Sequence, residues 1–554
     1  MTGDTKAVPT SKKPSTAIPQ AKPQAKSVDQ PLASLAPKSV SGIQPGFAEF
    51  ERHYKGGAAQ VVSTRLVADL ETPVSAYLKI ANALPMSFLL ESVEGGTTRG
   101  RYSVIGLAPD LIWRAHGPKA EINRTAQDDA NAFVADKAPT LQSLRALLDE
   151  SAISLPEGLP PMAAGVFGYM GYDTVRLIEN LPEMKPDALA VPDAIMIRPT
   201  LMLIFDSVKD EVLVVTPVRP DTKISARQAY DAALARIAHG VAKLDSPLPH
   251  FTAARLDTLE LPEPVSNTTE AEYLGMVASA KEYIKAGDIF QVVLSQRFSC
   301  PFALPSFALY RALRRLNPSP FLFHLNFGTF SLVGSSPEIL VRVRDGEVTI
   351  RPIAGTTRRG ASEAEDKYLG EALLADPKER SEHLMLLDLG RNDVGRVAQT
   401  GTVSVTDQFV IERYSHVMHI VSNVIGQLDG KNHDAIDALM AGFPAGTVSG
   451  APKVRSMEII AELEKSKRGP YAGCVGYFSA GGEMDTCIVL RTAVVKDGWL
   501  HVQAGAGITN DSIASSEQQE CINKAKAIVR AAEEAVRFAA KATTGGNGNG
   551  GVFG

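Results

Sequence analysis

The chain has 554 residues, which is enough for one large domain or for several of ordinary size. Its hydrophobic share of 44% and charged share of 21% are those of a globular protein, and its formal net charge is −5. The sequence has no dense run of Lys or Arg, which argues against a nucleic-acid partner and leaves any anionic substrate to be held by local cations.

The N-terminal segment, residues 1–45, is rich in Pro, Ser, Lys and Ala and has few large apolar residues. Such a segment buries too little surface to offset its ordering entropy, so we expect a disordered tail. A transit peptide is the alternative, but the segment lacks arginine and a clear amphipathic pattern. The Gly/Asn-rich end, residues 541–554, is predicted to be a second disordered tail.

Three features predict a cytoplasmic protein. The apolar stretch at residues 194–205 is broken by Arg198 and Pro199, so we expect no membrane span, and the N-terminus has no continuous apolar core of a signal peptide. The four cysteines are too few for a disulfide framework and lack metal-ligand spacing, which suits a reducing compartment.

Between the tails the pattern mixes helices and strands. Helical spacing is found at residues 141–148, 226–244, 271–286 and 516–539. Short β-branched or apolar runs that predict strands lie at residues 289–298, 329–333, 339–343 and 500–504. Strands often follow strands with no helix between them, which predicts an α+β fold with antiparallel sheets.

Charged residues near the C-terminus form a candidate site. Glu517, Glu520 and Lys524 lie at i, i+3 and i+7, which places them on one helix face. Alone, such a face is usually only solvated. Upstream lie Gly505 and Gly507, whose small size lets backbone N–H groups approach an anion closely.

A second acidic cluster lies at residues 379–382. Mg²⁺ typically takes one or two protein carboxylates and completes its coordination with water and substrate oxygens. Glu382 and Glu517 could supply such a site, although spacing alone does not prove it.

Short motifs follow one another along the second half of the chain. They are RPIAGT (351–356), KERSEH (378–383), DLGRND (388–393), HVMHIVS (416–422), FPAGTVSGAPK (443–453), RGPYAGCVGYF (468–478), DT..VLRT (485–492) and AGAGI (504–508). In this order they resemble the chorismate-utilising enzymes, specifically the anthranilate synthase component I family, and the resemblance extends over about residues 47–539. Each motif is weak alone, but chance agreement of the whole series is negligible.

The resemblance implies an anthranilate synthase-type fold, an α+β unit of two large packed antiparallel sheets flanked by helices. Residues 46–265 would form a regulatory N-terminal part, and residues 266–540 would form the chorismate-binding catalytic part.

The resemblance also implies a Mg²⁺ site and a site for the carboxylates of chorismate. Glu382 and Glu517 would hold the metal, with Glu520 as a further acidic residue. Arg491 has the planar donor fork that suits the enolpyruvyl carboxylate. The other substrate-binding residues implied are Thr447, Tyr471, Gly505, Gly507 and Lys524.

Two residues would carry proton transfers by the same resemblance. Glu338 would be the general acid that protonates the departing C4 hydroxyl, which requires a raised pKa from partial burial and neighbouring carboxylates. His419 would serve the second step, in which the C2 proton and the enolpyruvyl group leave.

Two positions separate the reactions of the family. Gln291 stands where isochorismate and salicylate synthases have a lysine that activates water, and a glutamine suits ammonia as the nucleophile. Ala354 stands where many aminodeoxychorismate synthases have a nucleophilic lysine. Anthranilate and pyruvate are therefore the expected products. The alternatives are an aminodeoxychorismate synthase component I and a non-catalytic chorismate- or tryptophan-binding regulator.

Ammonia would come from a separate glutamine amidotransferase subunit. The nearest match to the amidotransferase elbow Gly-x-Cys-x-Gly is at residues 472–476, where Ala472 replaces the first glycine. Cys474 is better interpreted as a packed residue.

A set of N-terminal motifs resembles the family's tryptophan feedback site: LLES (89–92), GRYS (100–103) and NPSP (317–320). The residues implied are Glu91, Ser92, Arg101, Pro320, Phe321, Leu322, Val475 and Tyr477. LLES alone fits the end of a strand equally well. Phe321 and Leu322 replace the family's usual Tyr-Met, and Ala514-Ser515 replaces the usual Pro-Glu before the metal helix.

Overall fold

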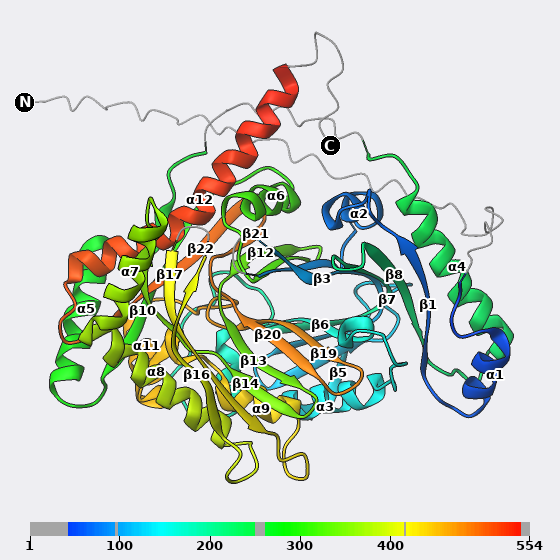
Figure 1. The fold of residues 1–554 in the computed structure, drawn as a ribbon, viewed down its shortest axis with the longest axis horizontal. Helices are drawn as coiled ribbons and strands as arrows, with labels where there is room; N and C mark the ends of the chain where they lie inside the picture. The colour runs from blue at the N-terminus through cyan, green and yellow to red at the C-terminus, as the bar shows by residue number, and fades with distance from the viewer. Residues whose placement is uncertain (1–41, 83, 95–97, 250–260, 415–416, 545–554) are drawn as a thin grey trace, which may run out of the picture. The chain divides into compact units, whose positions relative to one another are not determined.

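The computed structural model describes residues 42–82, 84–94, 98–249, 261–414 and 417–544 (Figure 1). Most of the two predicted tails lies outside the described residues. The last helix continues to Thr544, a few residues past the predicted start of the C-terminal tail. No helix in the described part is long and apolar enough to span a membrane.

Helices and strands are both abundant. The helices are α1 (Phe47–Lys55), α2 (Pro73–Ile80), α3 (Thr140–Ser151), α4 (Ala226–Leu244), α5 (Glu270–Lys285), α6 (Ser306–Leu316), α7 (Glu363–Ala375), α8 (Pro377–Gly395), α9 (Ala435–Gly442), α10 (Gly446–Ser449), α11 (Lys453–Leu463) and α12 (Ala514–Thr544), with 3₁₀ turns η1 (Pro161–Ala163) and η2 (Tyr172–Leu177). The strands are β1 (Gln60–Val67), β2 (Ser87–Glu94), β3 (Thr98–His116), β4 (Lys119–Asn123), β5 (Val134–Pro139), β6 (Gly165–Met170), β7 (Ala194–Asp206), β8 (Glu211–Val218), β9 (Val265–Ser266), β10 (Gln291–Pro301), β11 (Phe321–Asn326), β12 (Phe330–Ser336), β13 (Ile339–Arg344), β14 (Glu347–Ile350), β15 (Ile353–Arg358), β16 (Ser404–Arg413), β17 (Val417–Gln427), β18 (Gly450–Ala451), β19 (Cys474–Ser479), β20 (Met484–Ile488), β21 (Thr492–Lys496) and β22 (Trp499–Ile508).

The predicted α+β fold with two antiparallel sheets is confirmed. The first sheet has the strand order β1–β8–β7–β3–β2–β11–β12–β21–β22–β10, and β9 and β18 pair with the free edge of β10. The second sheet has the order β5–β4–β3–β7–β6–β19–β20–β13–β14–β17, and β15 and β16 also pair with β17. The long strands β3 and β7 belong to both sheets.

β3 passes from one sheet to the other at a bulge. Ala108 has a positive φ of 51°, and the register with β7 shifts between Pro109 and Leu111. Before the bulge, Ile105 faces the helices that cover the first sheet; after it, Trp113 faces the helices that cover the second sheet. A bulge bends a strand and reorients its side chains, which is what this crossing requires.

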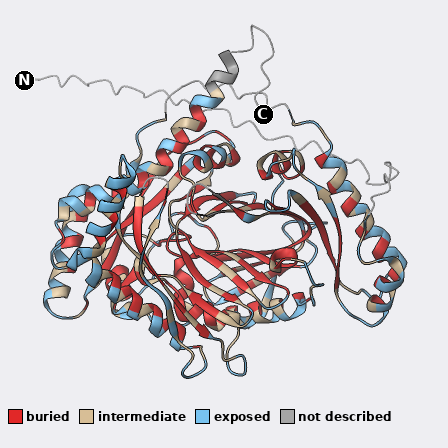
Figure 2. Cartoon of the chain, in the orientation of Figure 1, coloured by how far each residue is buried: buried red, intermediate tan, exposed pale blue. Residues whose placement is uncertain are grey.

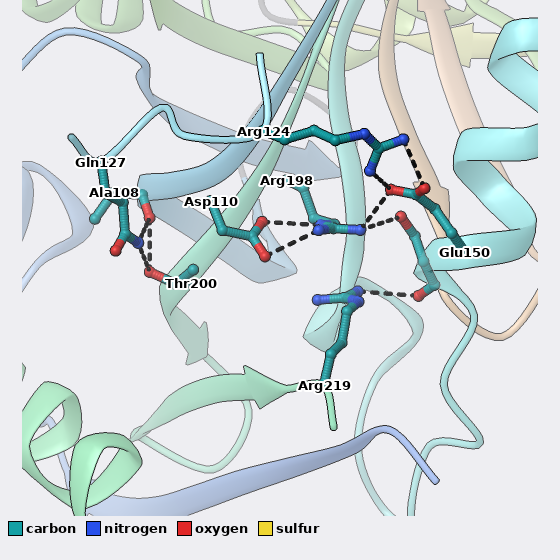
Figure 3. A network of polar contacts seen from close by, with 9 residues as sticks. Ala108, Asp110, Arg124, Gln127, Glu150, Arg198, Thr200 and Arg219 are labelled. Carbon is teal, nitrogen blue, oxygen red and sulfur yellow. Dashed lines mark hydrogen bonds and ion pairs between the residues drawn. The ribbon is translucent and has the colours of Figure 1, made fainter. Parts of the chain in front are cut away.

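Arg198 of β7 lies at the centre of a polar network at this bend (Figure 3). It donates to both oxygens of Asp110 at 2.8 and 3.0 Å and to Glu150 of α3 at 3.1 Å. Arg124 also binds Glu150, at 2.9 Å through each of two nitrogens, and Arg219 donates to the carbonyl of Ser151 at the end of α3, at 3.0 Å. The network connects the bend to the adjoining helix end.

Apolar side chains form three cores, which lie between four layers in the order helix–sheet–sheet–helix. Figure 2 shows that most residues of the strands are buried. The middle core lies between the two sheets and includes Phe88, Phe167 and Tyr477. Helices α1, α2, α4, α6 and α12 cover the first sheet, and α3, α5, α8, α9 and α11 contribute to the core of the second. Because strand side chains alternate between faces, neighbours such as Phe88 and Leu89 enter different cores.

Candidate active site

Glu338 follows β12 and directly precedes β13. Its backbone carbonyl accepts a hydrogen bond from Ile488 N at 3.0 Å, so the residue is held between the β12–β13 junction and β20. The side chain is 6% exposed, and Thr447 Oγ1 donates to its Oε1 at 3.0 Å. Burial raises the pKa of Glu338 to about 8, against the opposing effects of the Thr447 bond and the Lys524 charge. A carboxyl that holds its proton at neutral pH can act as a general acid.

His419 lies on β17 opposite a bulge in β15. Gly355, at φ +67°, is skipped in the register between Ala354 and Thr356. His419 Nδ1 lies 3.0 Å from the Gly355 carbonyl and 3.1 Å from Thr356 Oγ1. Burial lowers the pKa of His419, so the ring is neutral, and a proton on Nδ1 donated to the carbonyl leaves Nε2 as a free base.

Lys524 and two glycines of β22 form the floor of the site. Lys524 Nζ donates to the Gly505 carbonyl at 3.0 Å and pairs with Glu520 at 2.7 Å. A Cβ at Gly505 would come 2.9 Å from the Tyr471 hydroxyl, and a Cβ at Gly507 would come 2.5 Å from Gln291 Nε2. Larger residues would therefore displace these two side chains. Gln291 Oε1 is buried without a hydrogen-bond partner.

Arg491 lies between β20 and β21 with a positive φ of 46°, and its carbonyl accepts from Ser335 N at 3.2 Å. Burial lowers the pKa of its guanidinium, and among the described residues only Tyr414 acts in the opposite direction. A desolvated guanidinium that forms no ion pair within the described chain suits a carboxylate ligand.

Carboxylates from α8 and α12 face one another. Burial raises the pKa of Glu382, with Glu379 and Glu517 adding to the effect and Lys378 opposing it. Burial likewise raises the pKa of Glu517, opposed by a bond to Ser512 and reinforced by Glu520. Acids that raise one another's pKa provide a favourable environment for a cation.

These acids fit the Mg²⁺ that the resemblance implies. Within the described ranges, no group of three or more His, Cys, Asp or Glu side chains is arranged to hold a metal. Mg²⁺ needs only one or two protein carboxylates, and Glu382 and Glu517 offer these from two different helices. Glu520 is paired with Lys524, which makes it the less available acid.

Two residues near the base were missed by the sequence prediction. Thr356 contacts His419, and Glu379 Oε2 lies 3.1 Å from the position of a Cβ on Gly355. Glu379 could have been found, because it precedes Glu382 by three residues and so shares its helix face. The bulge that brings Thr356 to His419 is marked in the sequence only by Gly355, since a glycine inside a strand indicates a bulge.

The residues predicted for feedback lie on or next to strands of both sheets and face two different cores. Glu91 and Leu322 face the helix layer, where Glu91 binds Tyr310 and Arg314 of α6, the latter at 2.6 and 2.9 Å. Phe321, Val475 and Tyr477 face the core between the sheets.

Two other members of the predicted set, Arg101 and Ser92, contact neighbouring residues of the first sheet. Arg101 pairs with Asp206 at 3.1 Å and is half exposed, and Ser92 packs against Gly100, where a Cβ would come 1.6 Å from its Oγ. Pro320 directly precedes β11, next to Phe321. The eight residues thus contact different cores, and their grouping into one tryptophan site stays a prediction.

Residues 87–530 match the family of chorismate binding enzymes. The chain is 56% identical to anthranilate synthase component 1 of Cereibacter sphaeroides over 502 residues, which cover 90% of this chain and 99% of the relative. It is 46% identical to the protein of the same name from Thermus thermophilus over 472 residues, or 85% of this chain and 97% of that one.

The fold is also similar to that of a solved structure. The crystal structure of anthranilate synthase component I from Streptococcus pneumoniae superposes with a TM-score of 0.68 at 36% identity and covers 84% of this chain and 99% of that one. With the sheets and the site described above, these likenesses show that the chain belongs to the family of chorismate-binding enzymes, together with the relatives named anthranilate synthase component 1.

Proposed function

We propose that the chain is the chorismate-converting subunit of anthranilate synthase, which forms anthranilate and pyruvate from chorismate and ammonia. The observation that supports this most directly is the buried Glu338, held by Thr447 and protonated at neutral pH. Gln291 and Ala354 support ammonia as the nucleophile, because neither side chain can activate water or attack the ring itself.

Substrate binding would use two charged groups, one for each carboxylate of chorismate. Glu382 and Glu517 would hold Mg²⁺, which when bound supplies charge neutralisation and Lewis acidity at the ring carboxylate. Arg491 would bind the enolpyruvyl carboxylate, with Tyr471 beside it, and burial would make this charge pair stronger than the same pair in water.

The chemistry would proceed in two steps. Ammonia attacks C2 while Glu338 gives its proton to the C4 hydroxyl, which leaves as water. His419 then takes the C2 proton at Nε2, the C3–O bond breaks, and the enolpyruvyl fragment gains a proton to become pyruvate. The pKa shifts support this division of roles. Glu338 keeps its proton at neutral pH and can donate it, whereas neutral His419 has an unprotonated Nε2 that can accept one.

Ammonia would come from a separate amidotransferase subunit, which the name component 1 of the relatives supports. Tryptophan would inhibit through the N-terminal part, residues 46–265, while residues 266–540 carry the chemistry. Every residue assigned above to chorismate, metal or proton transfer lies in the second range.

Anthranilate fluorescence with the purified chain, chorismate and Mg²⁺ tests the proposal. Ammonium should support turnover, glutamine alone should not, and EDTA should abolish activity until Mg²⁺ is restored. An aminated product that retains the enolpyruvyl group, with no release of pyruvate, would instead indicate an aminodeoxychorismate synthase. No consumption of chorismate under any of these conditions would refute catalysis altogether.

A further inference from the structure

Arg297 of β10 is a buried cation that forms no ion pair with any residue the structure describes. It is 6% exposed, and its Nη1 has no hydrogen-bond partner. Its backbone is fixed by Asn267, which accepts from Arg297 N and donates to its carbonyl, both at 2.9 Å. Burial lowers the pKa of Arg297, and Asp187, the acid that opposes this shift, is itself 3.6 Å from Lys467. A buried charge without a partner is costly, so this one needs a functional or structural reason.

Gln503 of β22 lies directly opposite Arg297 in the register and is also incompletely bonded. Its Oε1 is buried without a partner, while its Nε2 donates to Ser295 Oγ at 2.8 Å. The amide orientation is determined by the network, because Ser295 Oγ gives its own proton to Glu464 at 2.8 Å and must accept from Gln503. A free donor on Arg297 therefore lies beside a free acceptor on Gln503.

A cavity of ≈ 10 Å³ lies between these groups. One water-sized molecule needs about 10–15 Å³. The polar side chains that line the cavity are Arg297, Arg468, Tyr471, Thr492, His501 and Gln503. The cavity thus has room for one molecule the size of water or ammonia. Arg297 Nη1 offers it a donor, and Gln503 Oε1 offers it an acceptor.

Tyr471 lies between this cavity and the candidate active site. It lines the cavity, and its hydroxyl occupies the space above Gly505. On the same face of β22 the next residue is Gly507, where the Gln291 amide occupies the side-chain space. Gln291 Oε1 is a second buried acceptor without a partner. The distance along β10 from Arg297 to Gln291 is roughly 20 Å, at about 3.3 Å per residue.

We propose that the Arg297–Gln503 cavity is a binding site for ammonia, the nucleophile, in its neutral form NH₃. This inference rests on the proposed function. The nitrogen lone pair accepts from Arg297 Nη1, and an N–H donates to Gln503 Oε1. Ammonium has no lone pair and carries a positive charge beside Arg297, so it is excluded and leaves its proton to solvent before entry.

The other charged groups around the cavity do not reverse this selection. Arg468 is neutralised by Glu464 at 2.6 Å. Burial lowers the pKa of His501 to about 4, so its ring is neutral. Lys496 lies farther along β21 and donates to the carbonyl of Leu189 at 2.7 Å. Among the described residues no carboxylate lines the cavity, so no anion there would attract ammonium.

Steady-state kinetics with ammonium chloride at fixed pH test the site. Arg297→Met removes the donor, and Gln503→Leu removes the acceptor. Each should raise the KM for ammonium by about tenfold, the effect of losing one good buried hydrogen bond, while the KM for chorismate stays near that of the wild type. Lys496→Met is the matched control, because it removes a nearby charge that does not line the cavity.

Each outcome separates the two proposals. An unchanged ammonium KM in folded variants overturns the inference and leaves the cavity as a water site. An equal rise in the chorismate KM, or an equal effect of Lys496→Met, also overturns it, because the effect would then come from the fold or from general electrostatics. If the wild type makes no anthranilate from saturating ammonium, it is the proposed function that fails.

Discussion

At the scale of single residues, the buried carboxyl of Glu338 sets the expected pH dependence. Its pKa is raised to about 8 by burial, and the protonated form is the active one in hydroxyl departure. Turnover should therefore fall as the pH rises through about 8, and Glu338→Gln should lose about 10²–10⁴-fold in rate because it has no proton to give. The pH profile of kcat for both proteins measures this.

The same residue links activity to stability with a definite sign. An acid whose pKa is higher in the folded state binds more protons there, so its contribution to the free energy of unfolding decreases as the pH rises from about 4.5 to about 8. Glu338→Gln lacks this loss and should match or exceed the wild type in thermal midpoint at the upper end of that range. A wild-type activity that stays flat well above pH 8 would contradict the assignment of Glu338 as the acid.

Individual site residues could be predicted where a local motif fixes them. The helical spacing of Glu520 and Lys524 is confirmed by their ion pair at 2.7 Å, and the glycines at 505 and 507 are needed because their side-chain space is occupied by Tyr471 and Gln291. Contacts between distant segments could not be predicted. The ion pair of Glu91 with Arg314 joins residues that are 223 positions apart.

At the scale of elements, the bend shared by β3 and β7 depends on Arg198. Arg198→Met would leave Asp110 and part of Glu150 without their charge partner; the Arg198 side chain is 10% exposed, and the two acids are 34% and 33% exposed. We expect a loss of roughly 2 kcal/mol in the free energy of unfolding, below the range for a fully buried pair because both acids reach solvent. Arg124→Met is the control, since Arg124 binds the same Glu150 from a side chain that is 56% exposed and should cost less than about 1 kcal/mol.

Chemical denaturation of the two variants provides the comparison. Equal small losses would mean that the network in Figure 3 is a surface feature and that the bulge at Ala108 holds the bend without it.

At the scale of the whole molecule, alternation and helical spacing were enough to predict an α+β fold with antiparallel sheets. The predicted helix at residues 226–244 coincides with α4, and the predicted strand at residues 339–343 coincides with β13 to within one residue. The sharing of β3 and β7 between the sheets was beyond prediction, because it depends on a bulge and on pairings such as Tyr102 with Asp206 and Ala115 with Ala194, which are 104 and 79 positions apart. The grouping of the feedback residues into one site stays a prediction, since strand alternation turns Leu322 toward the helix layer and Phe321 toward the core between the sheets.

Those two faces suggest how a ligand of the N-terminal part could act on catalysis. Glu91 is bound by Arg314 and Tyr310 of α6, and α6 packs on α12, where the Arg315 guanidinium lies 4.9 Å from the centre of the Phe538 ring. α12 carries Glu517, Glu520 and Lys524 of the candidate active site. The ammonium group of tryptophan could pair with Glu91 only by displacing Arg314, which would release α6 and disturb the position of α12.

Two variants should therefore shift tryptophan inhibition in opposite directions. In this proposed competition, Arg314→Met removes the cation that competes for Glu91, so a lower tryptophan concentration should give half-inhibition. Glu91→Gln removes the anion that the ligand needs and should raise that concentration. A coupling of about 1–3 kcal/mol between sites corresponds to roughly 5–150-fold, which is a measurable range for both shifts. Inhibition curves for anthranilate formation from chorismate and ammonium provide the test, with Arg101→Met as a control because its partner Asp206 lies outside α6. Shifts of both variants in the same direction would exclude competition between tryptophan and Arg314 for Glu91, because competition requires that one partner's loss strengthens the other.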